Sequence, residues 1–237
     1  MKTRISTLTL ILLSFLISST AFTQEADVDT VKITNNSKST SADSGFDQQG
    51  YYTFRPDLRK CMSPVCGGFF VKAVNQKLTR CANGRRQAEC YVASLSNRKN
   101  FDMSSAVLVQ GAIKPKTYPE FGNLGIFAVA AAFSSATETI GKQLFVGLEN
   151  NGIVCITTPC FSVDQYLLNG KKIRAISAID LEAVGASDEL LGEARSIIDR
   201  GEVLIASGVN RQTEEVGGKG VAFVAERFYL PIKAEIK

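Results

Sequence analysis

The sequence predicts a mainly β protein of the α+β class, built from two related antiparallel β units with one helix in the second unit. Three observations predict this. Short runs of β-branched and aromatic residues alternate with turn residues along most of the chain. A cysteine loop occurs twice, as Cys61-Met-Ser-Pro-Val-Cys66 and as Cys155-Ile-Thr-Thr-Pro-Cys160, at an offset of 94 residues. One stretch near the C-terminus has helical periodicity and a signal at each helix end.

Further landmarks predict an internal duplication. The offset of 94 also carries three polar residues onto equivalents, namely Asn75 onto Asn169, Lys77 onto Lys171 and Arg80 onto Arg174. Residues 107–113 resemble residues 203–209 at an offset of 96, and residues 122–133 resemble residues 217–228 at an offset of 95. We therefore predict β unit one at residues 51–142 and β unit two at residues 143–237. The alternative is that short β-strands resemble one another without a common origin.

The N-terminal residues have the pattern of an export signal. A basic start is followed by an apolar run at residues 5–17 and by small residues up to Ala21, so residues 1–21 are predicted to be a signal peptide. The run is shorter than the roughly 20 residues that span a bilayer, so no transmembrane span is expected after signal removal. Residues 22–50 contain few large apolar residues and are predicted to be a flexible linker. The expected location is secreted or periplasmic.

In unit one we expect strands at residues 49–54, 69–74, 91–95, 107–113 and 126–133. Asn83-Gly84 lies between Cys81 and Cys90 and is the strongest short signal for a tight reversal, so a hairpin is expected there. The run Ala130-Ala-Ala132 leaves a short helix as an alternative to the last strand.

In unit two we expect strands at residues 144–148, 161–168, 173–181, 203–209 and 221–232. The helix lies between the third and fourth of these strands. Ser187 is a good N-cap, Asp188 and Glu189 suit the positive end of the helix dipole, and Gly201 is a good stop. Its apolar residues fall on one face: Leu190, Leu191, Ala194, Ile197 and Ile198.

The cysteines predict three disulfides. Six cysteines in an exported chain allow 15 pairings. If each unit closes its own bridges, Cys155 pairs with Cys160, the duplication pairs Cys61 with Cys66, and Cys81 is left with Cys90. A zinc site made of the four cysteines of unit one is an alternative that their spacing fits poorly. A catalytic dithiol is weaker still, because the spacing is not Cys-x-x-Cys.

Missing residue types limit the chemistry. The chain has no histidine, which excludes an ordinary Ser or Cys triad and any imidazole metal site, and it has no tryptophan, which weakens a carbohydrate-stacking platform. Two carboxylate pairs remain for a hydrolase, Asp180 with Glu182 and Glu214 with Glu215. Both are expected to be solvated. We predict no catalytic residue, no metal and no cofactor.

Charge separates the two units. Residues 51–142 carry 13 Lys and Arg against 5 Asp and Glu, whereas residues 143–237 carry 10 against 13. Basic residues of unit one gather near the cysteine turns, and these are the predicted binding residues: Arg55, Arg59, Lys60, Arg80, Arg85 and Arg86. They would attract an acidic partner, such as an anionic envelope polymer, or another protein. The alternative is a solvated surface. No nucleic-acid partner is expected.

Two motifs carry a family resemblance. Arg55-Pro-Asp-Leu-Arg-Lys-Cys-Met-Ser-Pro-Val-Cys-Gly-Gly68 and Asn151-Gly-Ile-Val-Cys-Ile-Thr-Thr-Pro-Cys160 resemble a family of exported bacterial proteins with a domain of unknown function. The resemblance covers roughly residues 51–232 and implies bacterial origin and export, but it assigns no activity. The sequence therefore favours a non-catalytic, disulfide-stabilised binding or envelope-associated module. The alternatives are a secreted protease inhibitor that presents the constrained turn of residues 62–65, and a carboxylate-based hydrolase.

Overall fold

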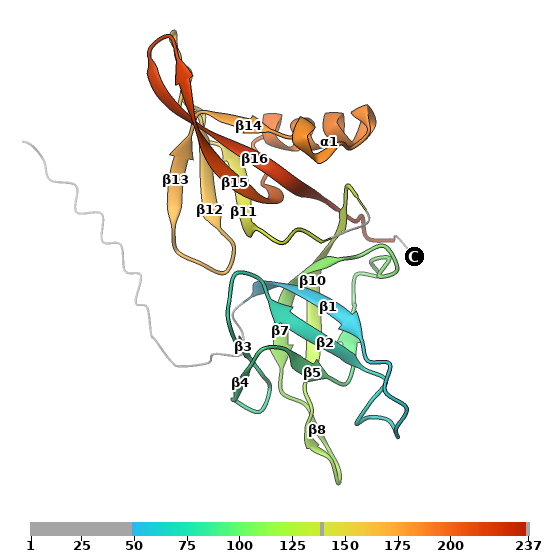
Figure 1. The fold of residues 1–237 in the computed structure, drawn as a ribbon. Coiled ribbons are helices and arrows are strands. Elements are labelled where there is room, and N and C mark those ends of the chain that lie inside the picture. The colour runs from blue at the N-terminus through green and yellow to red at the C-terminus, as the bar shows by residue number, and fades with distance from the viewer. Residues whose placement is uncertain (1–48, 138–139, 236–237) are drawn as a thin grey trace, which may run out of the picture. The chain divides into compact units, whose positions relative to one another are not determined.

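The computed structural model describes residues 49–137 and 140–235 (Figure 1). We call these ranges the first half and the second half. The predicted signal peptide and residues 22–48 of the predicted linker lie outside the described residues, whereas Gly50 already begins the first strand. Within the described ranges, no helix has the length and apolar character needed to cross a membrane.

The described residues are mainly β with one α-helix, as the sequence predicts. The first half contains β1 (Gly50–Pro56), β2 (Phe69–Ala73), β3 (Thr79–Arg80), β4 (Arg86–Gln87), β5 (Cys90–Val92), β6 (Leu95–Ser96), β7 (Leu108–Lys114), β8 (Thr117–Tyr118), β9 (Gly122–Asn123) and β10 (Ile126–Ser135). The second half contains β11 (Leu144–Asn150), β12 (Val163–Leu167), β13 (Ile173–Ile176), β14 (Ala178–Asp180), a short 3-10 turn (Glu182–Val184), α1 (Asp188–Asp199), β15 (Leu204–Glu215) and β16 (Gly218–Pro231).

One sheet joins the two halves. Its strand order is β13-β12-β11-β15-β16-β10-β7-β1-β2-β5, and neighbours along this path are antiparallel. Two short strands lie outside this order and pair in parallel with strands of the sheet: β6 pairs with β10, and β14 pairs with β16. The halves meet where β10 pairs with β16, around Ser134 opposite Leu230.

Equivalent strands of the two halves pair in the same register. β1 pairs with β2 through Tyr52 opposite Ala73, and β11 pairs with β12 through Val146 opposite Leu167, which is the same pairing shifted by 94. β7 corresponds to β15 at an offset of 97 and β10 to β16 at an offset of 96. The offsets of 96 and 95 counted from the sequence are therefore each one residue short.

A bulge also recurs at equivalent positions. The register between β7 and β10 shifts between Val129 and Ala131, and the register between β15 and β16 shifts between Ser207 and Gly208. A glycine faces each bulged strand. A Cβ on Gly111 would lie 2.1 Å from the Ala128 carbonyl oxygen, and a Cβ on Gly208 would lie 2.2 Å from that of Val224. Only glycine fits such a close approach of two backbones.

The apolar side chains form one cluster in each half and a third at their junction. The junction cluster contains Leu108, Phe145, Leu168, Ile205 and Tyr229 from both halves. Helix α1 covers the cluster of the second half with Leu191, Ala194 and Ile197, which are buried. As predicted, the Ser187 side chain caps this helix by accepting a hydrogen bond from the Leu190 amide.

Two strand predictions need correction. The strand predicted at residues 173–181 is two strands, β13 and β14, separated by Ser177. β13 pairs with β12, whereas β14 pairs with β16, and Ser177 exchanges hydrogen bonds with Val221 of β16. β15 continues to Glu215 rather than ending at 209, since its polar second part pairs with β16. The strand predicted at residues 126–133 is confirmed as β10, so the alternative of a short helix at residues 130–132 is wrong.

Candidate anion-binding site

Two of the predicted binding residues, Arg55 and Arg59, lie beside the ring of Phe70. The Arg55 guanidinium carbon is 4.3 Å from the ring centroid, and its Nη2 donates to Glu89 Oε2 at 2.8 Å. Arg59 Nη2 donates to Asp57 Oδ2 at 2.8 Å and to the Val65 carbonyl oxygen at 3.1 Å. Both guanidinium groups are therefore already paired within the fold.

Asp57 and Tyr91 hold the loop closed by the Cys61–Cys66 disulfide. The Asp57 side chain is only 1% exposed, and its pKa is lowered chiefly because the Arg59 guanidinium donates to the carboxylate. Tyr91 Oη donates to the Pro64 carbonyl oxygen at 2.7 Å and accepts from the Gly68 amide at 3.2 Å. This group of residues shapes the loop.

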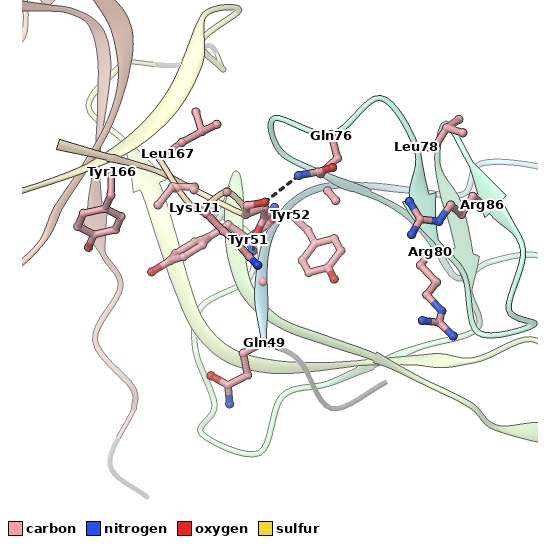
Figure 2. Close-up of a pocket in the computed structure, with 15 residues that line it drawn as sticks. Gln49, Tyr51, Tyr52, Gln76, Leu78, Arg80, Arg86, Tyr166, Leu167 and Lys171 are labelled. Atoms are coloured by element: carbon pink, nitrogen blue, oxygen red, sulfur yellow. Dashed lines mark hydrogen bonds between the residues drawn. The ribbon is translucent and has the colours of Figure 1, made fainter. Parts of the chain in front are cut away.

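Arg80 and Arg86 face each other across the β3–β4 pair and line a pocket of about 550 Å³. Figure 2 shows the two guanidinium groups on one side of this pocket, Tyr166 on the opposite side, and Tyr51 and Tyr52 between them. We call this the tyrosine pocket. Its walls come from β1, the segment from β2 to β4, and the end of β12 with the loop that follows it.

The charge of the tyrosine pocket has one sign. Arg80, Arg86 and Lys171 line it, and the described lining includes no Asp or Glu. The charge of Glu149 helps to raise the pKa of Tyr166, but Glu149 does not line the pocket. Three cations around one concavity concentrate anions there, since neighbouring low-dielectric walls focus the field.

The three tyrosines of this pocket are hydrogen-bond donors at neutral pH. Burial raises the pKa of Tyr51 and of Tyr52, and burial also raises that of Tyr166, with the nearby Tyr51 and Glu149 adding to the effect. Each side chain therefore combines an apolar ring with a protonated hydroxyl. The Tyr52 and Phe127 rings pack in a T-shaped arrangement, with centroids 5.0 Å apart.

Asn169 fixes the pocket wall to β1. Its Nδ2 donates to the carbonyl oxygens of Tyr51 at 2.7 Å and Val74 at 3.0 Å, while its Oδ1 accepts from the Tyr51 amide at 2.8 Å. Gln76 adds a hydrogen bond to the Asn169 carbonyl oxygen at 2.7 Å, drawn dashed in Figure 2. Segments far apart in the sequence are thus held in one wall.

Asn75 of the first half makes the equivalent contacts to backbone groups of the second half. Its Nδ2 donates to the carbonyl oxygens of Phe145 at 2.6 Å and Leu168 at 2.9 Å, and its Oδ1 accepts from the Phe145 amide at 2.9 Å. Asn75 and Asn169 both have positive φ, 57° and 56°. Together they form a reciprocal link between the halves, which we call the asparagine clasp.

Sequence reasoning found part of this site and missed the rest. Lys60 and Arg85 are exposed and do not line the tyrosine pocket. Tyr51, Tyr166 and Lys171 were not predicted as binding residues, although Lys171 and Asn169 were landmarks of the repeat. The equivalence of Asn75 and Asn169 in the repeat was the available signal, but their hydrogen bonds to the other half join residues 70 to 118 positions apart.

All six cysteines are paired as predicted, Cys61 with Cys66, Cys81 with Cys90 and Cys155 with Cys160. The alternative zinc site therefore has no thiolates to use.

None of the four carboxylates considered for a hydrolase lines the tyrosine pocket. Glu182 pairs with Arg195, and its pKa is lowered mainly by a backbone hydrogen bond at the start of its own turn. Glu215 accepts from the hydroxyls of Ser177 and Thr213. These contacts secure turns of the second half.

The chain belongs to the DUF6748 family, a domain of unknown function that matches residues 50–235. The match covers both halves of the sheet together. Neither the curated proteins nor the solved structures contain a match to the chain.

Proposed function

We propose that this protein is an exported bacterial binding module without catalytic activity, and that its tyrosine pocket binds an anionic saccharide of the cell envelope. One observation carries this proposal: three cations and three tyrosines line a single pocket whose described lining has no carboxylate. Arginine guanidinium groups, such as those of Arg80 and Arg86, have the planar geometry that suits a carboxylate or phosphate.

The tyrosines favour a saccharide over a small inorganic anion. A sugar ring has apolar C–H faces and hydroxyl edges, and a phenol ring offers a flat face and a hydroxyl to match them. In a chain without tryptophan, tyrosine is the remaining ring with both properties. The pocket volume of about 550 Å³ is within the range of small-ligand sites.

The test is calorimetric titration with galacturonic acid tetrasaccharide, with a neutral galactose tetrasaccharide as the comparison. We expect the acidic sugar to bind and the affinity to fall with added salt. The double variant R80Q/R86Q should weaken binding by about tenfold or more, since hydrogen bonds to charged groups contribute about 1.5–3 kcal/mol each.

The matched control is R98Q/R174Q, which removes the same charge from two exposed arginines outside the pocket. It should bind like the unmodified protein, and circular dichroism should show both variants folded. Equal binding of the neutral sugar, or equal losses in the two double variants, would contradict the proposal.

Two features support export and a duplicated origin. Each of the six cysteines lies in a disulfide, which suits an oxidising compartment, and residues 1–21 have the signal-peptide pattern. The matching registers and the reciprocal asparagines support an internal duplication. Fractionation of expressing cells and N-terminal sequencing of the mature chain would test the export step.

A protease inhibitor is the second candidate, but a different loop favours it. The predicted turn is held by hydrogen bonds from the Val65 and Cys66 amides to the Met62 carbonyl oxygen, and it exposes Met62 to 74% and Val65 to 37%. At the loop closed by Cys155–Cys160, Ile156 inside the loop and Val154 just before it are almost completely exposed. Titration of elastase-type serine proteases tests this candidate, and V154D should abolish any inhibition.

A further inference from the structure

A second pocket adjoins the tyrosine pocket. It has a volume of about 590 Å³ and lies between the segment that follows β2 and the segment that leads into β11. Three lysines line it, Lys72, Lys77 and Lys142, and its described lining has no Asp or Glu. We call it the lysine pocket. Glu226 contacts the same segment, but its Oε2 is occupied by the amides of Lys142 and Gln143 at 2.9 and 3.2 Å.

The two pockets occupy equivalent positions in the two halves. At the offset of 94, residues of one pocket fall on residues of the other: Gln49 on Gln143, Tyr51 on Phe145, Val74 on Leu168, Asn75 on Asn169 and Lys77 on Lys171. Ala73 and Gln76 line both pockets, so the pockets meet at the asparagine clasp.

We propose that the ligand is a linear polyanionic saccharide that lies across both pockets, with the lysine pocket as a second site for its negative charges. This inference rests on the proposed function of the tyrosine pocket. Three cations in each pocket, without an acidic lining residue, match a chain that carries a charge on each unit. A single small anion would use only one of them.

The different side chains of the two pockets fit this arrangement. The reciprocal asparagine contacts and the antiparallel pairing of β10 with β16 relate the halves by an approximate two-fold rotation. A polysaccharide chain has a direction, so a chain that crosses this axis runs through the second pocket in the opposite direction relative to that pocket's residues. The ring contacts made in the tyrosine pocket therefore cannot be repeated in the lysine pocket. Lys72 stands where the tyrosine pocket has Tyr166, and an ammonium group attracts charge without requiring one ring orientation.

The experiment compares affinities for galacturonic acid disaccharide, tetrasaccharide and octasaccharide. We expect the octasaccharide to bind about tenfold or more tighter than the disaccharide, because occupying the first pocket raises the effective concentration at the second. The triple variant K72Q/K77Q/K142Q should lose this gain with length and keep the disaccharide affinity. The charge-matched control K99Q/K219Q/K233Q changes residues outside both pockets and should keep the gain.

The outcomes separate the two proposals. If the disaccharide binds and R80Q/R86Q abolishes binding, but affinity does not rise with length or the rise survives in K72Q/K77Q/K142Q, the second site is refuted and the proposed function stands. If no galacturonate binds to the unmodified protein, both are refuted. If polyphosphate binds with the same length dependence and galacturonates do not, the saccharide assignment is refuted as well.

Discussion

Asn75 and Asn169 show what a single residue type does in this fold. Each adopts positive φ, which asparagine tolerates better than most residues, and each aims its amide at backbone groups of the other half. The sequence repeat identified both positions as equivalent. It could not predict their hydrogen bonds, because a local pattern holds no information on partners 70 or more residues away.

Replacing Asn169 should destabilise the fold strongly. N169A removes three hydrogen bonds to backbone groups and keeps an unfavourable φ, so we expect a loss of about 3 kcal/mol in the free energy of unfolding. N169G should lose about 1 kcal/mol less, since glycine accepts this φ. Urea denaturation measures both losses.

Asn83 provides the control for this series, because its side chain accepts only from the nearby Arg85 amide. N83A should change the free energy of unfolding by less than about 0.5 kcal/mol. Losses for N169A as small as those for N83A would show that the asparagine clasp contributes little to stability.

Asp57 should make the fold sensitive to acid. Its pKa in the folded protein is below the ordinary value of 3.8, so the folded state binds this proton less tightly than the unfolded state. Its contribution is therefore complete above that value and disappears as the pH falls through the folded pKa. The urea midpoint of D57N should lie below that of the unmodified protein at neutral pH, and the gap should close in acid.

The R59Q background tests the cause of this pH dependence. Arg59 lowers the pKa of Asp57, so D57N should have a much smaller effect in protein that already carries R59Q. A gap that stays constant from neutral pH into acid would instead assign the effect of D57N to packing.

At the scale of elements, hydrophobic and β-branched runs predicted the long strands and the helix well. The shortest strands, such as β8 and β9, were missed because two residues carry no period. The second part of β15 was missed because its outward residues are polar, and only its pairing with β16 reveals the strand. Gly111 and Gly208 lie in the similar runs 107–113 and 203–209, but the sequence did not indicate that each must be glycine because a partner strand approaches it closely.

The two bulge glycines should respond alike to substitution. In G111A and G208A the new methyl group would meet a backbone carbonyl at 2.1 or 2.2 Å, so each should cost about 1–3 kcal/mol by overpacking. G192A is the control, since this glycine lies inside helix α1 with open space around it. It should stabilise the protein by up to about 1 kcal/mol. Thermal unfolding compares the three variants, and neutral effects at both bulges would contradict the steric argument.

At the scale of the whole molecule, the site depends on both halves. Charge counting found the basic side of the tyrosine pocket in the first half, through Arg80 and Arg86. Charge counting could not find Tyr166 or Lys171, because the second half is acidic overall. These residues lie at the pocket because the asparagine clasp holds their segment against β1. The composition of each unit was predictable, but the pocket follows from how the units join.

The same junction should make unfolding a single event. β10 pairs with β16 at the junction, and two hydrogen bonds extend this pairing just past the strand ends: Ala136 N to the Phe228 carbonyl oxygen at 3.0 Å and Ile232 N to that of Ala132 at 2.8 Å. A buried cluster with side chains from both halves lies there too. Neither half can unfold without exposing the apolar face of the other, so amide hydrogens of β1 and β11 should exchange with the same global free energy of opening.

N169A provides the decisive comparison, because the residue it changes lies in the second half and bonds to β1 in the first. We expect the variant to lower the opening free energy of the slowest amides in β1, β7, β11 and β15 by the same amount, measured by hydrogen exchange with mass spectrometry. If β11 and β15 lost protection while β7 kept it, the halves would be independent folding units. The tyrosine pocket would then lie between two separately stable bodies rather than within one cooperative fold.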